Sequence, residues 1–178
     1  MSIRSIGRYE IDEDTFSRQI LIDGWSQKSI EEGSVFIAGA GALGNEVVKN
    51  LVLAGIGKIY IMDFDHVIKA NLNRCILFTL EDAELKTQKV EALAKNVKKL
   101  RKNINTEIIP INRNLLDLNG DEDFLKDADL YVSCLDGVAS RLKLNILSLI
   151  NGKPLVDGGM EGFEGYVRVT IPGKTAWL

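Results

Sequence analysis

Residues 63–74 bring together two carboxylates, two asparagines and an arginine. A carboxylate such as that of Asp63 accepts hydrogen bonds from ribose hydroxyls, and an arginine such as Arg74 makes paired hydrogen bonds to phosphate oxygens. Asn71 can hold a phosphate or ribose oxygen without adding charge. For any one of these residues, the ordinary interpretation is a polar loop whose arginine pairs with a surface acid. Their order after a glycine-rich loop favours a nucleotide site instead.

That glycine-rich loop is Gly39-x-Gly41-x-x-Gly44, between an expected strand and an expected helix. In this context Gly39 permits a tight turn, Gly41 lets phosphate approach the backbone, and Gly44 lets helix and strand pack closely. The N-terminus of the helix offers free N–H groups and a positive dipole end. Asp63 follows Gly44 by nineteen residues, at the end of the next strand. The loop predicts a bound nucleotide, but it does not separate ATP from NAD.

Strands and helices alternate along the chain, which is typical of a doubly wound sheet. Short apolar runs predict strands over 34–38, 58–62, 106–111, 130–134, 155–157 and 166–171. Helical patterns cover 16–22, 26–32, 45–54, 86–103, 124–128 and 140–150. The last strand follows a Gly-rich turn rather than a helix, which favours antiparallel pairing. We therefore expect a Rossmann-like α/β fold with a mostly parallel sheet and an antiparallel C-terminal strand.

Composition limits the classes of protein to which the chain can belong. With 178 residues, 46% hydrophobic and 26% charged, it suits one soluble globular domain. The net charge of −3 does not indicate a nucleic-acid-binding face. No run reaches the roughly 18 apolar residues of a membrane span, and the start lacks the pattern of a secretory signal. Cys75 and Cys134 form no CxxC pair, so we expect free thiols and a cytoplasmic protein.

Taken in order, these motifs resemble the ubiquitin-activating-enzyme superfamily, including the ThiF, MoeB and HesA type adenylyltransferases. The matching pieces are Ser17-Arg18-Gln19-Ile20, Gly39 to Gly44, Asp63-Phe-Asp65, Asn71-Leu-Asn73-Arg74, Lys89-Val-Glu91, Cys134-Leu-Asp136-Gly137 with Arg141, and Pro154-Leu-Val-Asp157. Each motif alone is weak, but together they span nearly all of the chain from Phe16 onward. Residues 1–15 form a polar N-terminal segment, and the resemblance implies an adenylation domain over 16–178.

The resemblance also implies an activity. Such enzymes use ATP to adenylate the C-terminal carboxylate of a ubiquitin-like or sulfur-carrier protein that ends in Gly-Gly, and they release pyrophosphate. A C-terminal carboxyl has a reference pKa of about 3.5 and is already an anion at neutral pH. No general base is needed, so the single histidine, His66, is read as incidental. The site needs cations instead, because it must bring one anion onto another.

By resemblance, the nucleotide-binding residues follow the motifs. Asp63 would bind the ribose, with Asp65 in the same motif, while Asn71 and Arg74 would bind the phosphates beside the glycine loop. Asp136 would hold a magnesium ion near the site of displacement. Without the resemblance, Asp136 could equally be a helix N-cap. ATP and magnesium are therefore the expected cofactors.

Two further assignments rest on family spacing. In similar enzymes, the arginine at the position of Arg18 reaches the triphosphate of the other subunit, which implies a homodimer or a pseudo-symmetric heterodimer. Residues 79–86 resemble a small insertion that lengthens the spacing from Arg74. The family's lysine is assigned first to Lys89, because Val-Glu-Ala follows it as in the family, with Lys86 as the alternate. Cys75 stands where the family usually has glutamine.

Many relatives continue with two CxxC pairs that hold zinc, and some carry a cysteine that accepts the activated protein as a thioester. This sequence stops about where the first pair would begin and has two cysteines in all. We therefore expect neither a four-cysteine zinc site nor a thioester region in this chain.

Two alternatives remain open at this stage. A nicotinamide-dependent oxidoreductase would explain the glycine loop and Asp63, but it leaves Arg18, Arg74 and Asp136 without a task. A non-catalytic partner subunit would keep the fold and support another chain. The acceptor is open as well, since a peptide or a modified tRNA base could supply the carboxylate.

Overall fold

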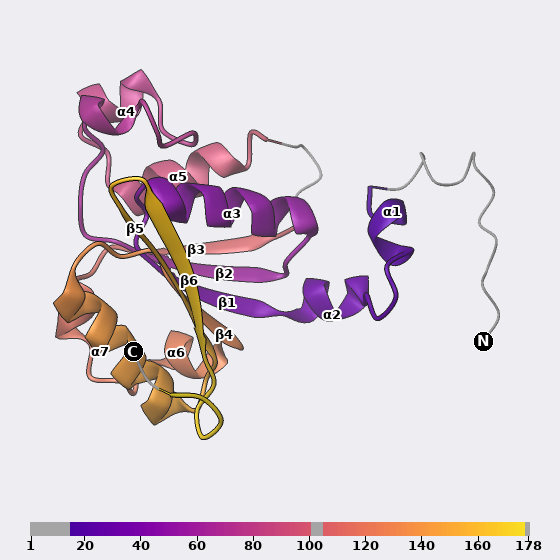
Figure 1. Ribbon diagram of the computed structural model, residues 1–178. Coiled ribbons are helices and arrows are strands. Elements are labelled where there is room, and N and C mark those ends of the chain that lie inside the picture. Colours follow the sequence, from indigo (N-terminus) through magenta and orange to yellow (C-terminus); the bar gives the residue numbers. More distant parts are fainter. Residues whose placement is uncertain (1–14, 101–104, 177–178) are drawn as a thin grey trace.

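The computed structural model describes residues 15–100 and 105–176. Its centre is a six-stranded sheet in the order β3-β2-β1-β4-β5-β6 (Figure 1). Strands β1 to β5 are parallel, and β6 runs antiparallel to β5. The strands are β1 Ser34–Ala38, β2 Lys58–Met62, β3 Glu107–Ile111, β4 Leu130–Ser133, β5 Leu155–Glu161 and β6 Glu164–Thr170. The expected fold class is confirmed.

Helices cover both faces of the sheet. Among the described residues they are α1 Ser17–Ile20, α2 Gln27–Glu32, α3 Ala42–Ala54, α4 Leu80–Glu84, α5 Lys89–Val97, α6 Asp123–Asp127 and α7 Val138–Asn151, with 3₁₀ turns η2 Lys69–Asn71 and η3 Leu115–Asp117. Helices α3 and α5 lie on one face, and α6 and α7 lie on the other (Figure 1). None of the helices in this part of the chain is long and apolar enough to cross a membrane.

Alternation along β1 explains the two layers of the core. Val35 and Ile37 pack with α3 and α5, whereas Phe36 and Ala38 pack with α6 and α7. All five residues of β1 are buried. A central parallel strand with helices on both sides must be apolar in both directions, which is why 34–38 reads as a continuous apolar run.

Several boundaries differ from the expectation. Helix α3 begins at Ala42, inside the glycine motif, and α5 covers Lys89–Val97 rather than 86–103. The start of α5 is delayed because Lys86 has a φ of +50°, a left-handed conformation that a helix does not tolerate. Helix α4 was not expected from the sequence. A capping box starts it, in which Thr79 and Asp82 satisfy each other's backbone N–H groups. Residues 1–14, most of the predicted polar segment, and 101–104 lie outside the described ranges.

The register aligns the carboxyl ends of the central strands. Ala38 is opposite both Met62 and Ser133, and Ser133 is opposite Asp157. The chain therefore leaves β1, β2 and β4 along one edge, beyond which β5 continues to Glu161, and the order reverses between β1 and β4. In open α/β sheets this switch point is where ligands bind. Helices α1 and α2 lie at the opposite, amino edge (Figure 1).

Candidate nucleotide-binding cleft

A cleft of about 540 Å³ opens at the switch point, between the glycine loop and the segments that follow β2 and β4. It brings together residues that are far apart in the sequence but were all predicted to belong to one site. Those that line it are Gly39, Gly41, Asp63, Asp65, Asn71, Arg74, Lys89 and Asp136. The remaining predicted residues, Arg18, Gly44 and Lys86, are not part of its wall.

The three glycines of the loop have different surroundings. Gly39 has a φ of +100°, and a Cβ there would lie 2.5 Å from the carbonyl oxygen of Cys134. A Cβ on Gly44 would lie 2.0 Å from the carbonyl oxygen of Gly39, so Gly44 lets α3 pack against the loop. A Cβ on Gly41 would meet nothing within 4 Å, although Gly41 lines the cleft. Only Gly41 therefore leaves open space beside the N-terminus of α3, where the helix favours an anion.

Asp63 fixes the shape of this loop. Its Oδ2 accepts a hydrogen bond from the Ala40 amide at 2.7 Å, and its Oδ1 accepts one from the Asp65 amide at 2.9 Å. Each carboxylate oxygen can accept a second hydrogen bond. The carboxylate can therefore hold the loop and accept hydroxyl groups of a ligand at the same time.

Arg74 and Lys89, two of the cationic residues that line the cleft, come from different segments. Arg74 donates to the carbonyl oxygen of Ala70 at 2.6 Å and to Oδ1 of Asn73 at 3.0 Å. Within residues 15–100 and 105–176 it forms no ion pair. The ammonium group of Lys89 lies 2.7 Å from Oδ2 of Asp65, with only 12% of the lysine side chain exposed. Lys89 is the first residue of α5, and the positive end of the helix dipole disfavours a cation there. An anionic ligand at this position would be stabilised by the Lys89 ammonium group and by the helix dipole.

Asn71 adds a polar donor to the same wall. Its side chain is buried, and its Oδ1 accepts a hydrogen bond from the Ile68 amide at 3.0 Å. Its NH₂ group has no hydrogen-bond partner among the described residues, although the residue lines the cleft. An amide donor without a protein partner, on a residue that lines the cleft, can bind a ligand oxygen at this position.

Asp136 stands alone in the loop between β4 and α7. It is exposed, and its carboxylate makes no hydrogen bond or ion pair within the part of the chain that the structure describes. In those same residues, no group of three or more His, Cys, Asp or Glu side chains could hold a metal. Magnesium is usually held by one or two carboxylates together with substrate phosphates and waters. Asp136 therefore fits a magnesium ion that is shared with a triphosphate, and it does not fit an all-protein metal cage.

Residues 16–178 match the model of the ThiF family. The chain belongs to the ThiF family. Its fold is that of a solved structure of Escherichia coli MccB with AMPCPP and MccA, with a TM-score of 0.80 at 24% identity over 93% of this chain and 51% of the other.

Of two curated relatives, one is named a ubiquitin-activating enzyme and the other an adenylyltransferase. The chain is 32% identical over 151 residues to a ubiquitin-activating enzyme E1-like protein of Saccharomyces cerevisiae, covering 84% of this chain and 23% of the relative. It is 31% identical over 162 residues to a sulfur carrier protein adenylyltransferase of Thermus thermophilus, covering 88% and 57% respectively. The chain therefore spans between about a quarter and just over half of these relatives.

An ion pair made by Arg141, which lines the cleft, was not predicted from the sequence of this ThiF-family chain. Arg141 of α7 donates to Oδ1 of Asp157 at 2.7 Å, to the carbonyl oxygen of Gly158 at 3.0 Å, and to that of Leu135. Only 2% of the Asp157 side chain is exposed. Arg141 thus ties β5 to the loop that carries Asp136. Both partners occur in the quoted family motifs, but their contact joins two elements and is not visible in spacing.

Other lining residues were also missed. Arg113 and Asn114, which follow β3, reach the cleft from the far side of β2. Among the described residues, the guanidinium of Arg113 has one ion-pair contact, a long one of 3.8 Å with Glu122. Polar residues after the third strand were not singled out, although every parallel strand of this sheet ends at the same edge.

Arg18 lies at the opposite end of the molecule. Its helix, α1, begins beside Phe16, and a Cβ on Gly55 would lie 2.6 Å from the Phe16 ring. Gly55 follows the last residue of α3, whose 13 residues span roughly 20 Å from the cleft. Arg18 therefore does not reach the cleft of its own chain, and its role across a dimer interface stays a prediction.

Neither cysteine has the character of a nucleophile. Burial raises the pKa of the Cys134 thiol to about 12 and also raises the pKa of Cys75. Both are free thiols, and both are protonated at neutral pH. The two cysteines that line the cleft therefore give no support to covalent catalysis by sulfur.

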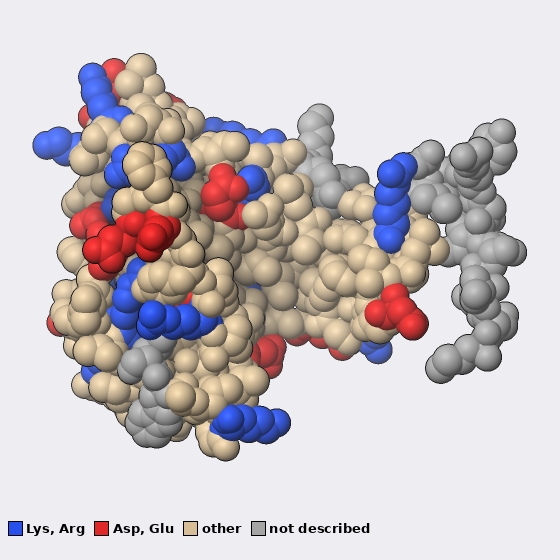
Figure 2. Space-filling model, in the orientation of Figure 1, with Lys and Arg blue, Asp and Glu red and all other residues tan. Residues whose placement is uncertain are grey.

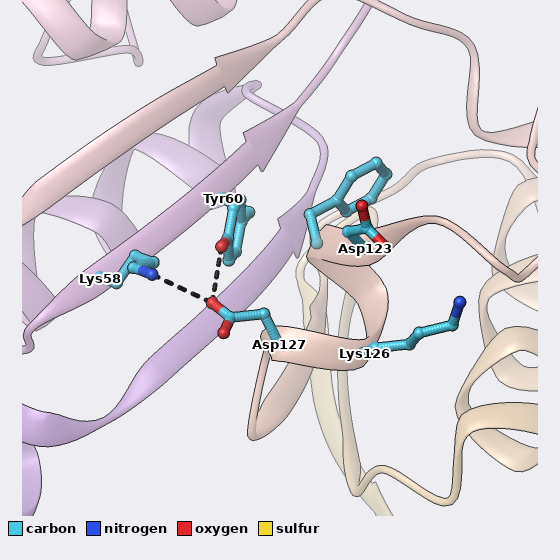
Figure 3. Close-up of a pocket in the computed structure, with 6 residues that line it drawn as sticks. Lys58, Tyr60, Asp123, Lys126 and Asp127 are labelled. Carbon is cyan, nitrogen blue, oxygen red and sulfur yellow. Dashed lines mark hydrogen bonds and ion pairs between the residues drawn. The ribbon is translucent and has the colours of Figure 1, made fainter.

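A second hollow, of about 690 Å³, lies at the amino edge of the sheet (Figure 3). There Tyr60 donates to Oδ2 of Asp127 at 2.6 Å, and Lys58 contacts the same oxygen at 3.1 Å. Hydrogen bonds from Tyr60 and Lys58 hold the pKa of Asp127 below its usual range. These polar groups satisfy one another, so the contact joins α6 to β2 and does not indicate a ligand.

Figure 2 shows Lys and Arg side chains interspersed with Asp and Glu on the face that carries β6. The described residues form no broad basic area on that face. This distribution of charge gives no support to nucleic-acid binding there.

Proposed function

We propose that this chain uses ATP to adenylate the C-terminal carboxylate of a ubiquitin-like or sulfur-carrier protein, with release of pyrophosphate. The main support for the proposal is that Arg74, Lys89 and the side-chain amide of Asn71 line one cleft beside Gly41. The names of two relatives, a ubiquitin-activating enzyme and a sulfur carrier protein adenylyltransferase, support the same reaction.

The proposed step is a displacement at the α-phosphorus of ATP. An oxygen of the acceptor carboxylate forms a bond to that phosphorus, and the bond from phosphorus to the bridging oxygen of the β-phosphate breaks. Pyrophosphate leaves with the electron pair. The acceptor is an anion at neutral pH, so the step requires no proton transfer from the attacking group.

The task of the protein is therefore electrostatic. Arg74 and Lys89 offset the repulsion between the carboxylate and the triphosphate, and amides at the start of α3 bind phosphate oxygens. Lys89 can exchange Asp65 for a phosphate because their contact, at 2.7 Å, lies at the cleft wall. Asp136 would hold magnesium, which when bound neutralises charge on the phosphates and on the leaving group.

The ribose end of the site is assigned to Asp63. Its two oxygens keep acceptor capacity after binding the amides of Ala40 and Asp65. In this proposal Arg18 serves the cleft of a second subunit, either another copy or a related chain, since its own cleft lies at the other end of α3.

The experiment is ATP–pyrophosphate exchange by the purified chain with two probes, one sulfur-carrier protein and one ubiquitin-like protein, each ending in Gly-Gly. We expect exchange with at least one probe, and a loss of about 10²- to 10³-fold in Arg74→Ala. Lys95→Ala, on the exposed side of α5, is the matched control and should exchange normally.

The result also separates the competing readings. Near-normal exchange in Arg74→Ala would contradict the proposed mechanism. If the chain binds ATP–magnesium but catalyses no ATP–pyrophosphate exchange, even after other carrier proteins of the two classes are added, a non-catalytic subunit would be favoured. A thermal shift with NAD and none with ATP–magnesium would favour an oxidoreductase.

A further inference from the structure

The buried polar side chain of Asn45 joins the two walls of the cleft. Asn45 is fully buried in the first turns of α3, with 0% exposure. Its NH₂ group donates to the carbonyl oxygens of Ala40 at 3.0 Å and Gly41 at 2.9 Å. Its Oδ1 accepts from the backbone amide of Leu77 at 2.9 Å. One side chain therefore binds the glycine loop and the segment that follows Arg74.

The same segment is held from the other side by α5. The carbonyl oxygen of Leu77 accepts from Nδ2 of Asn96 at 2.9 Å, and that nitrogen also lies 2.7 Å from Oδ2 of Asp82. Asn96 and Asp82 are buried, with 6% and 1% exposure. The backbone of Leu77 is thus fixed on its N–H side by α3 and on its C=O side by α5.

These contacts act on Arg74 through the backbone. The amides of Arg74 and Cys75 both donate to the carbonyl oxygen of Asn71, at 3.1 and 3.0 Å. Leu77 follows two residues later, and Cys75, Leu77 and Phe78 pack in the core beneath α3 and α5. A shift of Leu77 relative to Gly41 would therefore carry Arg74 away from the phosphate position.

We infer that Asn45 is a positioning residue, which sets the distance between the Gly41 loop and Arg74 so that both act on one triphosphate. This inference rests on the proposed function for its catalytic consequence. Its structural part, the coupling of two segments, does not depend on which ligand binds. Asn45 does not line the cleft, so it acts only through the groups it holds.

The first test is a double-mutant cycle in ATP–pyrophosphate exchange with the Gly-Gly probe. We expect Asn45→Ala to lower kcat by about tenfold or more, with KM for ATP nearly unchanged, because the loop still binds phosphate while Arg74 is misplaced. In an Arg74→Ala background, Asn45→Ala should cause little further loss, since the two residues act together. Full multiplication of the two losses would overturn the inference.

A matched control is Asn151→Ala. Asn151 also donates from a helix to two backbone carbonyls, those of Gly120 and Leu147, but away from the cleft. The kcat of Asn151→Ala, expressed per folded molecule, should equal that of the wild type. An equal loss of kcat in Asn151→Ala would mean that Asn45 is merely structural.

A second measurement is independent of activity. Hydrogen exchange of the Leu77 amide should accelerate strongly in Asn45→Ala, whereas amides of β1 keep their protection.

Asn45→Asp keeps the side-chain oxygen that accepts from the Leu77 amide but loses the hydrogen bonds to the carbonyl oxygens of Ala40 and Gly41. The Leu77 amide should therefore stay protected in this variant, while kcat still falls. Unchanged exchange at Leu77 in Asn45→Ala would refute the coupling, even if the wild-type chain showed no exchange of pyrophosphate. If Asn45→Ala does not fold, Asn96→Ala tests the same coupling from α5, because it removes the hydrogen bond to the Leu77 carbonyl oxygen.

Discussion

The backbone amide of Ala40 lies 2.7 Å from Oδ2 of Asp63, so the glycine loop after β1 is tied to the end of β2. Asp63 was predicted as a ribose ligand from its place after the glycine loop and from the family resemblance. The contact gives it a second task, because the carboxylate also holds the loop whose N–H groups face the cleft.

Asp63→Ala should therefore weaken nucleotide binding and stability together. We expect the affinity for ATP–magnesium to fall by about tenfold, and the free energy of unfolding to fall by about 1–3 kcal/mol, because the Ala40 amide loses its acceptor. Calorimetric titration and urea unfolding measure the two effects. An Asp63→Ala variant with wild-type affinity for ATP–magnesium would show that the nucleotide lies elsewhere.

The two candidate lysines can be separated by one pair of variants. Lys89 lines the cleft, and Lys86 lies outside it in a left-handed turn. We expect Lys89→Ala to reduce pyrophosphate exchange by about 10²-fold, as for loss of one charged donor, and Lys86→Ala to have little effect. The opposite order would assign the family lysine to Lys86.

The Arg141–Asp157 pair should matter chiefly for stability. Removal of one partner leaves an uncompensated buried charge, so Arg141→Ala should cost about 3–5 kcal/mol in urea unfolding. Replacement of both, as Arg141→Met with Asp157→Leu, should recover most of that loss. Equal destabilisation by the single and double variants would mean that Arg141 acts through its contacts with the Leu135 and Gly158 carbonyls.

Asp82 should make stability depend on pH in the acid range. Burial raises its pKa, but hydrogen bonds from Thr79 and Asn96 outweigh burial and hold the pKa below its usual range. Because the folded-state pKa is depressed, its stabilisation is complete above the ordinary aspartate value of about 3.9 and is lost as the pH falls through the folded value.

Urea unfolding of the wild type and Asp82→Asn at several pH values between about 5 and 3 tests this dependence. The difference in stability between the two should shrink as the pH falls. Parallel curves for wild type and Asp82→Asn would exclude the depressed pKa.

Much of this arrangement could be predicted because it depends on local patterns. The buried run 34–38 and the glycine loop are readable since a central parallel strand must be apolar and a tight turn needs Gly39. Asp63, Arg74 and Asp136 follow strands whose carboxyl ends share one edge, so their convergence follows from the topology.

What escaped prediction depends on contacts between distant segments. Asn45 and Leu77 are separated by 32 positions, and no periodicity links a buried asparagine to a backbone amide. The pair of Arg141 and Asp157 is hidden for the same reason. Helix α4 was missed because its five residues are too few to show a helical period, and only its capping box marks it.

The central claim is that Arg74, Lys89 and the Gly41 loop bind one triphosphate. A crystal structure of the chain with magnesium and a non-hydrolysable ATP analogue tests it most directly. The account predicts phosphate oxygens within hydrogen-bond distance of Arg74, Lys89 and amides at the start of α3, with the ribose at Asp63. A nucleotide bound in another position, with Arg74 still directed to Ala70 and Asn73, would contradict it.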